Sequence, residues 1–238
     1  RRAKRQAGRT SLPTNTPNIE WTDAGTPRAA AFDDVYYSDA DGRAEAEHVF
    51  LAGNSLPDRW RETPSFTIAE LGFGTGLNFL TARSAWRYAA PTTARLHFVS
   101  FEAHPMTAAD IRQALSRWPD LGIDADALLS SWPPAPGFST RDVGAARLTL
   151  GVGDANDLLP RWQDRADAWF LDGFNPAKNP DLWRAELMAE LHASTAPTGT
   201  FATYTAAGWV RRNLIAAGFT VAKINGYGTK REMLVGHV

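Results

Sequence analysis

Glu-Leu-Gly-Phe-Gly-Thr-Gly, residues 70–76, stands between a short apolar run and an amphipathic segment with helical periodicity. A strand, a glycine-rich turn and a helix in this order are typical of ligand-binding α/β folds. Glycine lets the backbone curve tightly and approach a ligand, and the first turn of a helix offers unpaired N–H groups. The stretch therefore predicts a mostly parallel sheet with a nucleotide-cradling turn at its edge.

The spacing of these glycines narrows the choice of ligand. Dinucleotide-binding turns follow Gly-x-Gly-x-x-Gly, whereas Gly72, Gly74 and Gly76 follow Gly-x-Gly-x-Gly. A carboxylate, Glu70, lies just before the first glycine, where it suits the zwitterionic amino-acid tail of a cofactor better than a pyrophosphate. The pattern favours S-adenosylmethionine over NAD or FAD.

The charge balance limits the partners of the chain. The 238 residues contain 25 Lys and Arg against 26 Asp and Glu, so no global positive field attracts nucleic acid or an anionic membrane, and any RNA contact must come from a local patch. The first nine residues include five basic ones, which read as a solvated tail or, less simply, as a tRNA-contacting arm. We find no apolar signal segment and no stretch of membrane-spanning length, and we expect a cytoplasmic protein with no membrane partner.

The chain has no cysteine, which excludes disulfides and Cys-ligated metals. Enzymes that methylate a pyrimidine ring carbon commonly need a Cys nucleophile, so we expect the methyl acceptor to be a heteroatom. The five His residues are scattered without ligand spacing, and we expect no metal.

Strand-like and helix-like segments alternate after residue 65, which predicts a parallel sheet covered by helices on both faces. The strand-like runs are 66–71, 96–102, 146–151, 166–171, 199–204, 219–224 and 231–236. The last two are separated only by Asn225 to Lys230, too short for a helical crossover, so they should pair antiparallel. This is the plan of class I S-adenosylmethionine-dependent methyltransferases, a Rossmann-like seven-stranded sheet with an antiparallel last strand.

Two regions stand apart from this alternation. Residues 1–65 are predicted to form a basic tail and an N-terminal appendage to a methyltransferase domain of residues 66–238, with an extended run at 19–22 and a helix-like run at 44–51. Residues 118–145 hold two Trp-Pro steps and are interpreted as an irregular excursion, either a packed surface loop or a functional one.

Carboxylates end four successive predicted strands: Glu70, Glu102, Asp154 and Asp172. Ligands of open α/β sheets bind outside the carboxyl ends of the strands. Glu102 would accept both ribose hydroxyls, and Asp154 would accept from the adenine amino group while the neighbouring backbone N–H, at Ala155, reads a ring nitrogen. Any one of these is ordinarily a solvated carboxylate or a helix cap, but four at successive strand ends favour a ligand site.

The residues after the fourth strand suggest how an acceptor would be handled. Methyl transfer from a sulfonium is an in-line displacement, and an amine acceptor must be neutral. Asp172 would accept a hydrogen bond from that amine and help to remove its proton. Phe174 would either stack on a base or pack in the core, and Lys178 would either meet a phosphate or stay solvated.

The chain resembles the tRNA 5-methylaminomethyl-2-thiouridine methyltransferases, the last enzymes of wobble-uridine modification, which in many bacteria form the N-terminal half of a bifunctional protein. The resemblance covers about residues 32–236, and its most specific strings lie at 167–179 and 230–234. Its motifs are residues 32–38, 49–54, 70–79, 167–174, 177–180 and 230–234.

This resemblance implies the roles of the site residues. Asp172 would face the aminomethyl nitrogen of the substrate uridine, with Phe174 beside it, and Tyr37 and Asn54 would close over the cofactor. S-adenosylmethionine would be held by Glu70, Gly72, Gly74, Gly76, Asn78, Glu102, Asp154 and Ala155. The second half of the bifunctional relatives, an FAD-dependent oxidase, has no counterpart here, so we expect no FAD in this chain. The chain would be either a stand-alone enzyme or an excised domain. The oxidase would then be fused in a longer chain or act in trans.

The tRNA partner requires a positive patch, and basic residues near the C-terminus are candidates. They are Arg211, Arg212, Lys223, Lys230 and Arg231, with Lys178 as a further candidate. The plain alternative is a solvated helix and strand edge.

Two other functions remain open at this point. An aminopropyltransferase of the spermidine synthase type shares the fold, but it should surround Asp172 with a paired acidic pocket, and the residues that follow are aromatic and basic. A non-catalytic tRNA-binding or cofactor-binding module would be expected to have lost a strand-end carboxylate, and all four are present.

Overall fold

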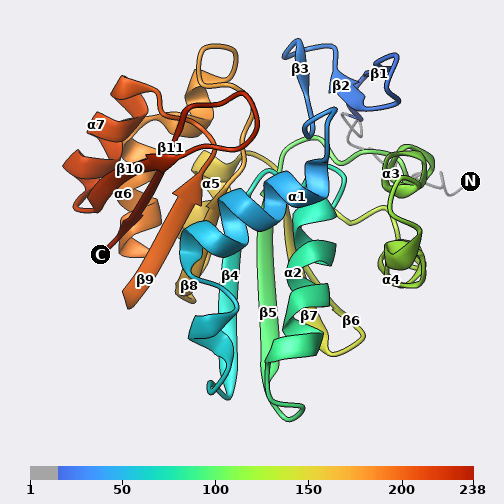
Figure 1. Ribbon diagram of the computed structural model, residues 1–238, viewed down its shortest axis with the longest axis horizontal. Helices are drawn as coiled ribbons and strands as arrows, with labels where there is room; N and C mark the ends of the chain where they lie inside the picture. The colour runs from blue at the N-terminus through green and yellow to red at the C-terminus, as the bar shows by residue number, and fades with distance from the viewer. Residues whose placement is uncertain (1–15) are drawn as a thin grey trace, which may run out of the picture.

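The computed structural model describes residues 16–238, so the basic residues at positions 1–9 lie outside the described part of the chain. Its centre is an eight-stranded sheet of order β10-β11-β9-β8-β4-β5-β7-β6 (Figure 1). The strands are β4 (Ser65–Leu71), β5 (Arg95–Glu102), β6 (Gly137–Val143), β7 (Ala146–Val152), β8 (Ala166–Leu171), β9 (Thr195–Thr203), β10 (Thr220–Asn225) and β11 (Glu232–His237).

The pairing confirms the predicted methyltransferase sheet. Strand β4 pairs in parallel with β5 and β8, and these pair in parallel with β7 and β9. Strand β11 is antiparallel to both β9 and β10, as the short loop between the last two predicted strands requires. All seven predicted strands are present, with ends shifted by a few residues.

The interpretation of residues 118–145 as irregular was wrong. This segment contains helix α4 (Gly122–Leu129) and strand β6, which pairs antiparallel with β7 at the edge of the sheet. Only Val143 of β6 is buried, while Phe138 and the polar residues between them remain partly or fully exposed. An edge strand with so little buried apolar surface has no apolar run by which its sequence could reveal it.

The central strands are apolar because helices cover both faces of the sheet. Ile68 of β4 belongs to one hydrophobic cluster with Leu80 of helix α2 (Leu77–Ala89). Leu71, on the opposite face of β4, belongs to a second cluster with Met188 of α6 (Ala185–Ala193) and Leu214 of α7 (Gly208–Ala217). Further helices are α3 (Ala108–Leu115) and α5 (Ala155–Leu158), with short 3-10 turns at Ala52–Asn54, Asp58–Trp60, Pro119–Leu121, Leu159–Arg161 and Pro180–Trp183.

The N-terminal segment forms a small antiparallel sheet of β1 (Ile19–Trp21), β2 (Pro27–Ala29) and β3 (Asp34–Val35), followed by α1 (Gly42–Ala46) and a π-helical turn (Glu47–Leu51). The small sheet lies at the end of the central sheet where β4 and β5 finish (Figure 1). Val49 and Phe50 share the hydrophobic cluster of α2, so residues before and after position 65 contribute to one core. Among residues 16–238, no helix is both long enough and apolar enough to cross a bilayer.

Candidate active site

A cavity of about 860 Å³ opens at the carboxyl ends of the central strands. One wall follows β4, β5, β7 and β8, and the opposite wall comes from the N-terminal segment, the end of β9 and the loop between β10 and β11. The volume is in the range of small-molecule sites. Residues as far apart in the sequence as Phe32 and Lys230 therefore meet around one space.

The glycine turn after β4 forms part of this wall as bare backbone. Gly72 and Gly74 have φ angles of 90° and 52°, which residues with a side chain rarely adopt. A Cβ on Gly72 would lie 2.7 Å from the carbonyl oxygen of Asp172, and one on Gly74 would lie 2.9 Å from the ring of Tyr36. Gly76 then precedes the first residue of α2. The turn fits a ligand that lies directly against the main chain.

Glu70 lies beneath this turn, fully buried. Its two carboxylate oxygens accept hydrogen bonds from Asn78 Nδ2 at 2.9 Å and from Ser100 Oγ at 2.7 Å. Burial raises the pKa of Glu70 well above its ordinary value, although both hydrogen bonds oppose the shift. In the described chain Glu70 is not among the residues that line the cavity, so it supports the wall from behind.

Glu102, at the end of β5, lines the cavity and is oriented by the backbone. One carboxylate oxygen accepts from the N–H of Gly74 at 2.9 Å, and the other accepts from the N–H of His104 at 2.8 Å. Each carboxylate oxygen has a further lone pair for a ligand hydroxyl. The structure thus joins two sequence-predicted residues, Glu102 and Gly74, in one wall.

Asp154 and Ala155 follow β7 and also line the cavity. Asp154 caps α5, accepting from the N–H of Asn156 at 2.8 Å and from the Asn156 side chain at 2.9 Å. Tyr37 lines the cavity from the N-terminal segment, where its hydroxyl donates to the carbonyl of Ala114 at 2.9 Å.

Asn54 lies in a different place from the one that the family resemblance implied. Its Nδ2 donates to the carbonyls of Phe50 and Trp169, and its Oδ1 accepts from Thr200 Oγ1 at 2.6 Å. It is fully buried and does not appear among the described residues that line the cavity. These bonds use its amide to tie a 3-10 turn to β8 and β9.

Asp172 stands after β8, at the junction of the two walls. Its Oδ2 accepts from Asn78 Nδ2 at 2.6 Å, so one amide bridges Asp172 and Glu70. Burial raises the pKa of Asp172 to about 7; the hydrogen bond from Asn78 opposes this shift, and the charge of Glu45 adds to it. A carboxylate that titrates near neutrality can accept a proton from an amine.

The opposite wall contains residues that sequence reasoning missed. The hydroxyl of Tyr204, directly after β9, donates to the carbonyl of Gly173 at 2.8 Å. Lys230 Nζ lies 4.0 Å from the centroid of the Tyr204 ring and 3.0 Å from Glu45 Oε1. Tyr36 meets Phe174 edge to face, with ring centroids 5.1 Å apart. The available signals were the position of Tyr204 at a strand end and that of Tyr36 within the motif of residues 32–38.

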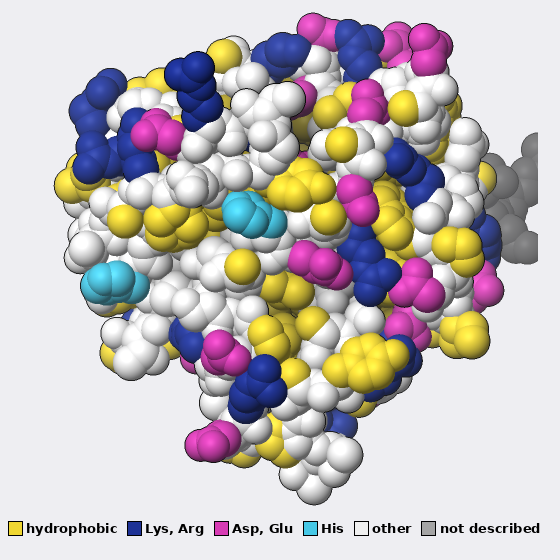
Figure 2. Space-filling view, viewed as in Figure 1, with side chains coloured by type: hydrophobic (Ala, Val, Ile, Leu, Met, Phe, Trp, Pro, Cys, Tyr) yellow, Lys and Arg dark blue, Asp and Glu magenta, His cyan; other side chains and the backbone are white. Residues whose placement is uncertain are grey.

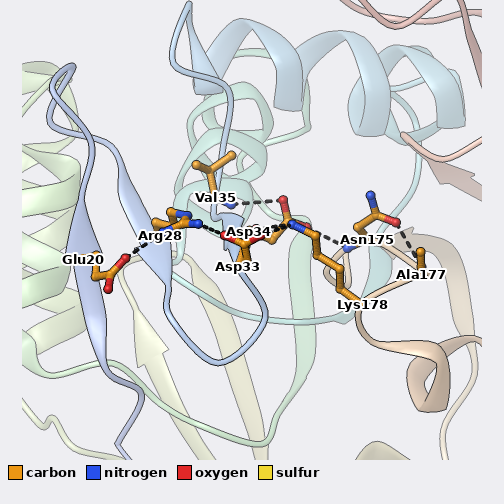
Figure 3. Close-up of polar contacts among 8 residues, drawn as sticks. All are labelled: Glu20, Arg28, Asp33, Asp34, Val35, Asn175, Ala177 and Lys178. Carbon is orange, nitrogen blue, oxygen red and sulfur yellow. Dashed lines mark hydrogen bonds and ion pairs between the residues drawn. The ribbon is translucent and has the colours of Figure 1, made fainter.

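Lys178 is joined to the N-terminal segment (Figure 3). Its Nζ contacts the carbonyl oxygen and, at 2.9 Å, the Oδ2 of Asp33. The N–H of Asn175 donates to Asp34 Oδ2 at 2.8 Å. The loop after β8 is therefore fastened to the turn between β2 and β3.

The predicted basic patch is divided between the cavity and the surface. Lys230 lines the cavity, whereas Arg211, Arg212 and Arg231 are not among the described residues around it. Figure 2 shows the face of the molecule that is seen in Figure 1. Lys and Arg side chains gather at its edge where α7 lies, and they are mixed with Asp and Glu elsewhere. Within residues 16–238, no group of three or more His, Cys, Asp or Glu side chains is placed to hold a metal ion.

Comparison with known proteins gives three results. A sequence profile described as S-adenosyl-L-methionine-dependent methyltransferase matches residues 119–238. The chain is 48% identical over 230 residues to the tRNA 5-methylaminomethyl-2-thiouridine biosynthesis bifunctional protein MnmC of Chromohalobacter salexigens, a match that covers 93% of this chain and 33% of the relative. It is 49% identical over 224 residues to the protein of that name from Pseudomonas aeruginosa, covering 92% and 34%. The chain thus spans about a third of the length of these relatives.

Two solved structures share the fold. MNMC2 from Aquifex aeolicus superposes with a TM-score of 0.72 at 24% identity, covering 94% of this chain and 72% of that one. A spermidine synthase in complex with a transition-state analogue gives a TM-score of 0.56 at 10% identity, covering 92% and 72%. At these identities the likeness is one of architecture.

Proposed function

This chain belongs to the family of S-adenosyl-L-methionine-dependent methyltransferases, and from that premise we propose that it methylates the amine of 5-aminomethyl-2-thiouridine at the wobble position of tRNA. The product is 5-methylaminomethyl-2-thiouridine. Identity of nearly one half to bifunctional proteins named for the biosynthesis of this nucleoside supports the proposal. The observation that carries it is Asp172, a carboxylate that lines the cavity at the end of β8, is held by Asn78 at 2.6 Å and has a pKa raised to about 7 by burial.

The wall after β4, β5 and β7 is the cofactor half of the cavity. The bare backbone of Gly72 and Gly74 would lie against S-adenosylmethionine, and Glu102 would accept its ribose hydroxyls. Asn78, Asp154 and Ala155 also line this half, with Glu70 and Gly76 acting from behind, and Tyr37 would close over the cofactor from the opposite wall. When bound, the cofactor supplies an electrophilic methyl group on a sulfonium.

Asp172 prepares the acceptor. An aminomethyl group is a nucleophile only when its nitrogen is neutral, and an ionised Asp172 would accept a hydrogen bond from that nitrogen and take its proton. The hydrogen bond from Asn78 fixes the Asp172 carboxylate, so the direction of the amine relative to the methyl group is set by the protein.

The rest of the substrate would be met by aromatic and basic groups. Phe174 would stack on the uracil ring, as aromatic side chains do with unstacked bases. Lys230, Arg211, Arg212 and Arg231 would meet tRNA phosphates, whereas Lys178 would act through its contact with Asp33. The relatives are about three times as long as this chain and are named bifunctional, which supports an FAD-dependent oxidase as a partner, fused or in trans.

The experiment that tests the proposal is transfer of labelled methyl from S-adenosylmethionine to tRNA from cells that lack the activity, followed by nucleoside analysis. We expect 5-methylaminomethyl-2-thiouridine to form at the expense of its aminomethyl precursor. Cofactor binding without transfer to tRNA would overturn the proposal. Assays with decarboxylated S-adenosylmethionine and a diamine would then test the aminopropyltransferase reaction, since the fold is shared with spermidine synthase.

A further inference from the structure

The turn between β2 and β3 brings an aromatic side chain into the acceptor side of the cavity. Phe32 stacks on Phe174 with ring centroids 4.7 Å apart and ring planes 23° from parallel. Both rings line the cavity, and neither is fully buried. One face of Phe174 is therefore covered by a residue from a segment about 140 positions away in the sequence.

This turn is held in place by charged groups at the cavity rim (Figure 3). Asp33 contacts Arg28 through one carboxylate oxygen and Lys178 through the other, and Arg28 also pairs with Glu20 at 2.7 Å. Asp33 has a φ of 50°, a left-handed conformation that costs free energy for a residue with a side chain, although Asp tolerates it better than most. The strain is retained at a residue whose carboxylate, like that of Asp34, joins the small sheet to the loop after β8.

We propose that Phe32 is a positioning residue of the acceptor pocket: it backs Phe174, so that the Phe174 ring stays in place to stack on a flat acceptor base. The Asp33–Lys178 and Asp34–Asn175 contacts set where Phe32 stands. This inference rests on the proposed function and deepens it, because it assigns the N-terminal sheet to recognition of the substrate base and not to the cofactor.

The first test is Phe32→Ala, with Phe32→Tyr as the variant that keeps the ring. We expect Phe32→Ala to lower kcat/KM for tRNA about tenfold or more, through a raised KM, because the Phe174 ring loses the neighbour that holds it in place to stack on the base. Calorimetry should give an S-adenosylmethionine affinity within twofold of wild type, which also shows that the variant is folded, and Phe32→Tyr should restore the rate. An unchanged kcat/KM, a parallel loss of cofactor affinity, or no recovery with Tyr would each overturn the inference.

The second test is a double-mutant cycle on the ion pair between Asp33 and Lys178. Asp33→Asn and Lys178→Met should each lower kcat/KM for tRNA by about two- to fivefold, the range of an exposed ion pair, and the double variant should be no worse than either single one. Asp58→Asn, which removes an exposed ion pair with Arg61, is the matched control and should leave kcat/KM unchanged. Additive losses would show that Asp33 and Lys178 act separately.

These outcomes separate the inference from the proposed function. If the wild type methylates tRNA and Phe32→Ala does so equally well, only the role of Phe32 fails. If the wild type binds S-adenosylmethionine and methylates no tRNA, the proposed function fails, and the assignment of Phe32 fails with it.

Discussion

The two walls of the cavity are built in different ways. The cofactor half follows adjacent strands of one sheet, and its parts are joined by short hydrogen bonds between carboxylate and backbone, such as Glu102 to the N–H of Gly74. The acceptor half is assembled from the β2–β3 turn, α1, the end of β9 and the β10–β11 loop. Its segments are joined partly by ion pairs: Lys178 with Asp33 at the surface, and Lys230 with the mostly buried Glu45 inside the cavity.

Because of this difference, we expect the cofactor half to be rigid and part of the acceptor half to be mobile. Exposed ion pairs contribute only about 0–1 kcal/mol each, so segments joined by them can part at little cost. Strands buried on both faces cannot move without disrupting the core. We infer that the position of the transferred methyl is set by the rigid half, while the β2–β3 turn of the acceptor half, held by the exposed Asp33–Lys178 pair, can move for a substrate as large as tRNA.

The largest expected effect lies at the junction of the halves. Asp172→Asn should lower kcat by about 10²- to 10⁴-fold, because the group that accepts the proton of the amine is lost. The affinity for S-adenosylmethionine should change by no more than a few-fold, since Asp172 belongs to the acceptor side. Single-turnover methyl transfer and calorimetry measure the two quantities. Equal losses in both would place Asp172 in the cofactor half and break the comparison.

Glu102→Ala should have the converse signature. Loss of charge-assisted hydrogen bonds to the cofactor should weaken S-adenosylmethionine binding by about ten- to a hundredfold. At saturating cofactor, kcat should stay close to wild type, and the KM for tRNA should not move. Titration of cofactor binding by calorimetry and a rate measured at several cofactor concentrations check this. A fall in kcat at saturation would mean that the two halves are not separable.

The cofactor half could be predicted from the sequence because its signals are local. A glycine turn after an apolar run, and carboxylates at the ends of successive runs, must converge once the strands pair in parallel. Another local signal, a loop too short for a helical crossover, predicted the antiparallel final strand. Pattern reasoning has a limit where a strand buries little apolar surface. It failed for β6, which buries only Val143 and so carries no apolar pattern. The role that the family resemblance implied for Asn54 has no local sequence signal behind it, and the direction of that side chain is set by a 3-10 turn that packs on β8 and β9.

The acceptor half was largely hidden from sequence reasoning for a physical reason. Phe32, Tyr36 and Glu45 reach the cavity only because the N-terminal segment docks across it, and no local periodicity encodes that docking. Tyr204 follows a predicted strand but is not a charged residue, so it did not stand out among strand-end side chains. Asp172 could be predicted to line the cavity because it follows a parallel strand, as the carboxylates after β5 and β7 do.

A smaller effect tests whether a residue of the acceptor half changes the pKa of Asp172. The rate at saturating substrates should rise with pH as Asp172 ionises, with a midpoint near its pKa of about 7. The positive charge of Lys230 lowers this pKa, so Lys230→Met should move the midpoint to higher pH. Arg61→Met, which removes an exposed cation paired with Asp58, is the control. A midpoint that stays in place or moves to lower pH would mean that the charge of Lys230 does not lower the pKa of Asp172.

The last expected effect is on stability, and it follows from the same carboxylate. The folded protein raises the pKa of Asp172 from 3.8 to about 7, mainly by burial, so the folded state binds this proton more tightly than the unfolded chain does. Its contribution to stability is therefore fully present below about pH 4, is lost as the pH rises toward 7, and stays absent above that. Asp172→Asn removes the titration and keeps an oxygen that can accept from Asn78. The Tm of the variant relative to wild type should then be higher at pH 8 than at pH 4, measured by thermal unfolding in matched buffers. The same difference at both pH values would mean that the junction of the two halves holds the charge of Asp172 without cost, and that its pKa is not set by burial.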